Sequence, residues 1–234
     1  MNITFEDINI AYEDNHLLVV VKPQNIAVCP DSTGDKNLLD LLKEYLIKTY
    51  DKAGEAYLGL VHRLDRPTGG VIVYAKTSKA ASRLAESMRA GAFEKKYYAV
   101  TIGTPKERRA ELRDMLYKNA EKNEVYKVPM ATDGAKLAVL EYKVLSEQPP
   151  LALLEINLIT GRSHQARVQL SSIGTPIFGD RKYGGEKMPV GYNLALWAAE
   201  LRFPHPITRE IMLFRVEPPT DEIPWKMFSI PSIL

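Results

Sequence analysis

The sequence of 234 residues contains one cysteine, Cys29, and four histidines. A single cysteine can form no internal disulfide, which favours a reducing cytoplasm as the location of the protein. One cysteine cannot complete a zinc site, and no two of the histidines have the spacing of metal ligands. We therefore expect no metal centre and no covalent cross-link.

Several motifs of common enzyme classes are missing. Neither Gly-x-x-x-x-Gly-Lys-Ser/Thr nor Gly-x-Gly-x-x-Gly occurs, so we predict no phosphate loop and no dinucleotide site. The Gly-x-Ser-x-Gly elbow of many serine hydrolases is also missing. The longest early apolar run, Leu17 to Val21, is too short to cross a bilayer, and the first residues lack a secretory signal. We expect a cytoplasmic protein that uses no cofactor, no metal and no membrane.

The composition is that of a globular protein, with 45% hydrophobic and 26% charged residues. Its net charge of +2 does not by itself indicate a nucleic-acid partner. Residues 89–118, however, carry eight basic and four acidic side chains, so this stretch is locally +4. Four aromatic residues lie among these charges: Phe93, Tyr97, Tyr98 and Tyr117. A surface that binds phosphates and stacks bases would have this pattern, and so would a solvated face.

Hydrophobic periodicity predicts an alternation of strands and helices. We expect strands near residues 17–22, 71–76, 95–102, 136–145, 151–159, 193–203 and 210–216. We expect helices over residues 37–50, from an N-cap at Ser78 to Gly91, and from near Ser163 to Gly174. These elements predict one α+β domain over residues 1–234 with a large, mainly antiparallel or mixed sheet.

The segment from Val61 to Gly70 places one carboxylate, Asp65, on a tight turn before a predicted strand. Pro67 fixes its own φ, and Gly69 and Gly70 permit backbone angles that other residues avoid. An aspartate that only caps its own turn would give the same pattern. With metal and nucleotide chemistry disfavoured, this lone acid is the best catalytic candidate.

Residues 62–65, His-Arg-Leu-Asp, together with Thr68-Gly69-Gly70 resemble the active-site motif of the RluA-type RNA pseudouridine synthases. Two further segments match that family in order. Residues 93–99 resemble its Lys-x-Tyr-x-Ala strand, and residues 160–168, followed by 174–180 and 183–184, resemble its third motif. The resemblance implies a pseudouridine-synthase-like fold, in which helices flank the sheet and RNA binds in a central cleft. Many relatives carry a small N-terminal RNA-binding domain; because the matching pattern starts almost at Met1, we expect a catalytic domain without that separate domain here.

The same resemblance implies three catalytic residues. Asp65 would be the nucleophile, Arg162 its counter-ion, and Tyr97 the residue that packs on the target base and helps to remove a proton. Whether Asp65 attacks the ribose, attacks the base or acts through a glycal stays open. The plainer interpretations are a surface ion pair for Arg162 and a core aromatic for Tyr97.

The RNA contacts implied by the resemblance begin with Arg63, which would fill the space of the displaced base or bind a phosphate. The other candidate RNA-binding residues are His62, Leu64, Lys95, Lys96, Arg108, Arg109, His164, Gln165 and Arg167. The target is a uridine of ribosomal RNA or tRNA, and a monomer is expected. A catalytically inactive RNA-binding relative is the main alternative. A metal-dependent nuclease or a glycoside hydrolase would need further carboxylates near Asp65.

Overall fold

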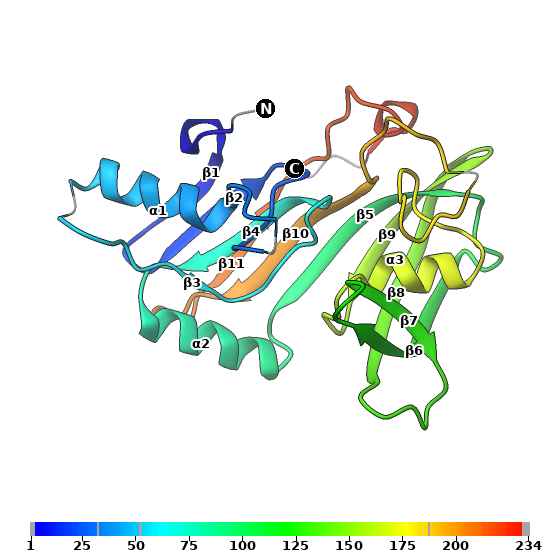
Figure 1. The fold of residues 1–234 in the computed structure, drawn as a ribbon, viewed down its shortest axis with the longest axis horizontal. Coiled ribbons are helices and arrows are strands. Elements are labelled where there is room, and N and C mark those ends of the chain that lie inside the picture. Colours follow the sequence, from blue (N-terminus) through cyan, green and yellow to red (C-terminus); the bar gives the residue numbers. More distant parts are fainter. Residues whose placement is uncertain (1–2, 32, 52, 187, 231–234) are drawn as a thin grey trace. The chain divides into compact units, whose positions relative to one another are not determined.

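The computed structural model describes residues 3–31, 33–51, 53–186 and 188–230. The chain divides into two compact units (Figure 1). Unit 1 consists of Met1–Phe93 and Glu200–Val216, and unit 2 consists of Glu94–Ala199 and Glu217–Leu234. The chain passes from one unit to the other after Phe93, Ala199 and Val216, and the second of these points falls within β10 (Leu196–Pro204).

Unit 1 combines antiparallel strands with two helices. Its elements are η1 (Phe5–Asp7), β1 (Asn9–Glu13), β2 (Leu17–Lys22), α1 (Leu38–Thr49), β3 (Gly59–Leu60), β4 (Gly69–Ala75), α2 (Ser78–Arg89), the end of β10, and β11 (Ile211–Arg215). Strand β2 pairs with β1 and with β4, β3 also pairs with β4, and β10 pairs with β11. All these pairs are antiparallel.

The centre of unit 1 is buried on both faces. Every residue of β4 is buried, as expected for the apolar run that follows its two glycines. Side chains of β2 and β4 that point to one face, such as Val19 and Val73, pack with Ala80 and Leu84 of α2. Figure 1 shows α1 on the other side of these strands. The turn that contains Asp65, directly before β4, is thus attached to a buried strand.

Unit 2 is a second antiparallel arrangement. Its elements are β5 (Glu94–Ile102), β6 (Arg109–Asn119), β7 (Glu124–Val128), β8 (Lys136–Gln148), β9 (Leu151–Leu158), α3 (Gln165–Ser172), the start of β10, and η2 (Trp225–Met227). The pairing order β5-β9-β8-β6-β7 is antiparallel throughout. Helix α3 packs through Val168 against Leu116, Val125 and Ala138 of the strands.

A buried ion pair fixes α3 to the segment that follows it. The Arg167 guanidinium donates two hydrogen bonds of 2.8 Å to the Asp180 carboxylate, and both side chains are almost fully buried. Asp180 also accepts the backbone N–H groups of Lys182 and Tyr183. Because both carboxylate oxygens and two guanidinium nitrogens of this pair are hydrogen-bonded, the two buried charges stabilise each other.

The predicted fold class is confirmed, with local corrections. The expected strand at residues 17–22 is found, but Thr77 rather than Ser78 caps α2, accepting the Ala80 N–H. The third helix begins at Gln165, two residues later than expected. Strands β1, β6 and β7 were not predicted, because charged residues interrupt their apolar pattern. The prediction that residues 1–234 form one catalytic domain stays a prediction.

Replacing Arg167 by Met should lower the free energy of unfolding by about 3–5 kcal/mol, because Asp180 would be left as a buried charge without its partner. Arg113→Met is the control, since Arg113 pairs with Glu111 while both side chains are about half exposed. Its effect should stay within about 1 kcal/mol. Urea denaturation of the two variants measures both values. Equal losses would contradict the structural role of the Arg167 pair.

Candidate functional site

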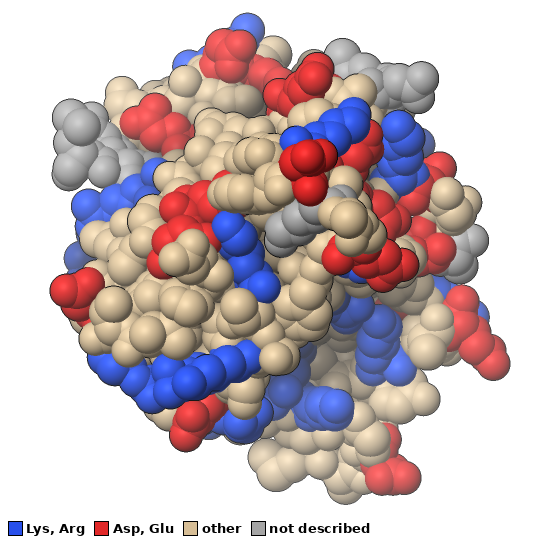
Figure 2. Space-filling view, turned by 90° about the vertical axis from the view of Figure 1, so that its left-hand side faces the viewer, with Lys and Arg blue, Asp and Glu red and all other residues tan. Residues whose placement is uncertain are grey.

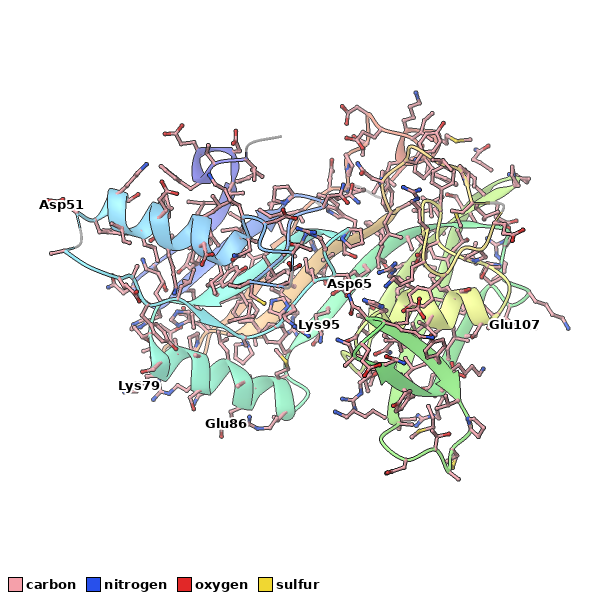
Figure 3. The ribbon with its side chains drawn as sticks, viewed as in Figure 1. Asp51, Asp65, Lys79, Glu86, Lys95 and Glu107 are labelled. Carbon is pink, nitrogen blue, oxygen red and sulfur yellow. The ribbon has the colours of Figure 1, made fainter. Side chains whose placement is uncertain are left out.

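Asp65 lies on a hydrogen-bonded turn immediately before β4 (labelled in Figure 3). The Thr68 N–H donates to the Asp65 carbonyl at 2.9 Å and closes the turn. The buried Leu64 side chain anchors the residue before the acid. Gly70 has a φ of +117°, which strains any residue with a Cβ atom. The sequence prediction of a tight turn that needs glycine after it is therefore confirmed.

Two side chains, one at the end of β2 and one just after it, bind the carbonyls of the two central residues of this turn. Lys22 Nζ donates to the Arg66 carbonyl at 3.0 Å and to the Pro23 carbonyl at 2.9 Å. Gln24 Nε2 donates to the Pro67 carbonyl at 2.9 Å. The turn is thus fixed both by its own backbone and by a neighbouring strand 44 residues away from it in sequence.

Lys22 is fully buried, with a relative exposure of 0%. Burial lowers the pKa of Lys22 to about 7, the Asp65 carboxylate opposes this change, and the Arg66 guanidinium adds to it. Sequence patterns did not single out Lys22, because a lysine that ends an apolar strand before a proline resembles an ordinary solvent-facing strand end. Its burial therefore places an ionisable side chain, on which the Asp65 charge acts, beside the turn in unit 1.

The other residues of the motif differ in exposure. His62 Nε2 accepts the Val73 N–H at 3.2 Å, and the ring packs edge-on against Phe93. His62 and Leu64 therefore shape the loop. Arg63 is exposed and makes no hydrogen bond or ion pair with any residue that the structure describes. Among these motif residues, Arg63 is thus the one that is ready to bind a partner.

In unit 2, β5 carries two of the predicted residues on one face. Tyr97 is buried with a relative exposure of 7%, and Lys95, two residues earlier, lies on the same side of the strand. A Cβ atom on Gly161 would lie 3.1 Å from Lys95 Nζ, so this amine lies beside the turn that contains Arg162. Burial lowers the pKa of Lys95 below its ordinary value.

The turn that contains Arg162 is held by Gln165. Gln165 Oε1 accepts the Thr160 hydroxyl at 2.8 Å and the Arg162 N–H at 3.0 Å. The Arg162 Nε–H donates to the Leu137 carbonyl at 2.9 Å, and its other guanidinium N–H groups bind no described residue. The side chain of Arg162 is thus fixed at one edge and open at the other.

The remaining predicted RNA contacts fall into two groups. His164, Gln165 and Arg167 have partners inside unit 2, and His164 Nδ1 lies 2.6 Å from the Tyr183 hydroxyl. Their assignment as RNA contacts stays a prediction. Among the surface cations, Lys96 pairs with Glu155 and Arg108 pairs with Glu147. Other cations are interspersed with acids on the face shown in Figure 2.

Within the described residues, no group of three or more His, Cys, Asp or Glu side chains could hold a metal ion. No helix in the same residues is both long and apolar enough to span a membrane. Asp65, Arg63, His62 and Leu64 belong to unit 1, whereas Lys95, Tyr97 and Arg162 belong to unit 2. Each half of the predicted site is therefore defined within its own unit.

A family model described as RNA pseudouridylate synthase matches residues 16–172, which include all three predicted catalytic residues. The chain belongs to this family. Its members are isomerases that convert uridine to pseudouridine in RNA, and the resemblance to the RluA type is confirmed.

Individual relatives of this family align over most of the chain. Ribosomal large subunit pseudouridine synthase D of Zymomonas mobilis is 35% identical over 95% of this chain and 73% of its own length. An RNA pseudouridine synthase of Bacillus subtilis, YhcT, is 32% identical over 93% of this chain and 70% of its own. The solved structure of human RNA pseudouridylate synthase domain containing 4 aligns with a TM-score of 0.76, 28% identity, and 90% and 88% coverage.

The lowered pKa of Lys22 predicts a pH dependence of stability. Between about pH 7 and 10 the unfolded chain keeps a proton that the folded protein loses, so the unfolded state binds more protons and stability rises with pH. From pH 7 to 9 this contribution is about 2 kcal/mol. Urea denaturation should show this rise in the unsubstituted protein relative to Lys22→Met. Parallel pH dependences of the two proteins would contradict the prediction.

Proposed function

We propose that this chain isomerises uridine to pseudouridine in ribosomal RNA or tRNA, with Asp65 as the nucleophile. The observation that carries the proposal is the fixed Asp65 turn, which occupies the place of the family motif within the matched residues. Relatives such as the Zymomonas mobilis protein, a ribosomal large subunit pseudouridine synthase, favour ribosomal RNA of the large subunit as the substrate. We further propose that residues 1–234 act as one catalytic domain, as a cytoplasmic monomer without metal or cofactor.

The reaction conserves every atom of the uridine. The bond between uracil N1 and ribose C1′ breaks, the base turns over, and a bond from C5 to C1′ forms. The C5 proton then leaves while N1 gains a proton. Attack by Asp65 on the ribose, attack on the base, and proton abstraction that leads to a glycal all begin with an ionised carboxylate. The first requirement of the site is therefore to keep Asp65 charged where water is scarce.

Arg162 and Tyr97 take the next two roles in this proposal. The Arg162 N–H groups that bind no described residue would pair with the Asp65 carboxylate and hold it in place in the RNA complex. The buried Tyr97 would pack on the target base and assist in removing the C5 proton. Both roles need a base that has left its helix, which costs a few kcal/mol. Arg63, exposed beside the nucleophile, would fill the space of that base.

A catalytically inactive RNA-binding relative is the competing function, and one experiment separates the two. We expect the protein, incubated in EDTA with transcripts of large-subunit rRNA and of tRNAs, to form pseudouridine that mass spectrometry detects. Asp65→Asn should abolish the product, because an amide cannot act as the nucleophile. Asp35→Asn is the control, since Asp35 is an exposed acid that binds the Arg66 side chain in the same unit. Product from Asp65→Asn at the normal rate would overturn the mechanism.

The two adjacent lysines of β5 should differ in their effect on RNA binding. Lys95 makes no hydrogen bond or ion pair with a described residue, whereas Lys96 pairs with Glu155 at 3.5 Å. Lys95→Met should weaken binding and reduce the slope of log K against log salt by about 1. Lys96→Met should change the slope much less. Fluorescence anisotropy with the same transcripts measures both, and equal slopes would reject the assignment of Lys95 to a phosphate.

A further inference from the structure

Lys22 combines features that a purely structural residue does not require. It is fully buried, and its hydrogen-bond acceptors among the described residues are the backbone carbonyls of Pro23 and Arg66. A neutral donor would satisfy those carbonyls without the cost of burying a charge. An ionisable group in such a place is a candidate for a role in a functional site.

The charges that act on Lys22 identify what its own charge serves. Two charged groups of unit 1 face it, the Asp65 carboxylate and the Arg66 guanidinium. The Arg66 guanidinium has its own carboxylate partner in Asp35, with which it forms an ion pair. The carboxylate that benefits from the Lys22 ammonium is therefore the predicted nucleophile.

The register of two strands places Lys22 beside the turn. Lys22, the last residue of β2, lies opposite Gly70 of β4, and Gly70 follows the turn that Asp65 begins. The bond from Lys22 Nζ reaches the carbonyl of Arg66, the residue directly after Asp65. The same ammonium thus fixes the backbone of the turn and acts electrostatically on its carboxylate.

We propose that Lys22 is a positioning residue for Asp65, which holds the turn through the Arg66 carbonyl and supplies a buried positive charge that favours the ionised carboxylate. This inference rests on the proposed function of Asp65. It assigns unit 1 its own source of charge stabilisation for the nucleophile. Asp65 is then partly prepared for reaction before Arg162 pairs with it.

The first test leaves Lys22 unchanged and needs no catalytic activity. NMR titration of the Lys22 side-chain carbons should give a pKa that falls by about 0.5 unit or more in Asp65→Asn, because the carboxylate favours the ammonium. Glu44→Gln is the matched control, since Glu44 is an exposed acid of the same unit that pairs with Lys48, and it should leave the Lys22 titration in place. An unchanged pKa in Asp65→Asn would overturn the proposal, even if the protein makes pseudouridine.

The second test separates the charge of Lys22 from its hydrogen bonds. Lys22→Gln keeps a donor but removes the charge, so the acidic limb of the single-turnover rate should move to higher pH. Lys22→Arg keeps the charge and should leave that limb in place. A rate that falls equally at every pH in Lys22→Gln would reduce Lys22 to a structural residue and overturn the proposal. If the unsubstituted protein formed no pseudouridine in RNA, the proposed function would be refuted instead. The NMR titration would still decide whether the Lys22 and Asp65 charges are coupled.

Discussion

A charge held away from water must be stabilised by the protein itself, and this requirement organises both units of the structure. In unit 2 it is met by complete pairing, since the Arg167 guanidinium and the Asp180 carboxylate satisfy each other. In unit 1 the Lys22 charge has no direct ion-pair partner of this kind among the described residues. The Lys22 side chain donates to the carbonyls of Pro23 and Arg66, and the Asp65 charge favours its protonated form. The first arrangement suits a permanent structural link. The arrangement around Lys22 would leave the Asp65 carboxylate able to react in the proposed function.

Strand register is what makes the second arrangement possible. Opposite residues of β2 and β4 are fixed by apolar side chains that are buried on both faces, such as Val20 and Ile72. A slip of one residue would turn the Lys22 side chain to the other face of the sheet and away from the Arg66 carbonyl. The packing of the unit 1 core therefore determines the electrostatics of the turn. The stability of unit 1 and the position of Lys22 at the Asp65 turn depend on the same contacts between β2 and β4.

Local patterns predicted the elements whose apolar residues are continuous or regularly spaced, including β2, β4 and the three helices. They missed β6, because its charged residues led us to treat the stretch as a basic surface. The period-two signal was present, since Ala110, Leu112 and Asp114 are less exposed than Arg109, Glu111 and Arg113, with which they alternate. The partner of Arg167 and the burial of Lys22 depend on tertiary contacts, which no local pattern contains. The Asp65 turn was predictable because proline and glycine restrict the backbone locally.

The ion pairs also change the meaning of the basic stretch at residues 89–118. Lys96 and Arg108 are each paired with an acid from another strand, so the local charge of +4 overstates the attraction for phosphates. Two cations without such partners among the described residues, Lys95 and Arg162, lie close together at one turn of unit 2, and Arg63 lies in the motif of unit 1. A few cations placed at the predicted catalytic residues favour recognition of one nucleotide over adhesion to any RNA, because each phosphate contact adds affinity without sequence information. In the proposed function, these cations would therefore add affinity, and selectivity for one uridine would require further contacts with the RNA.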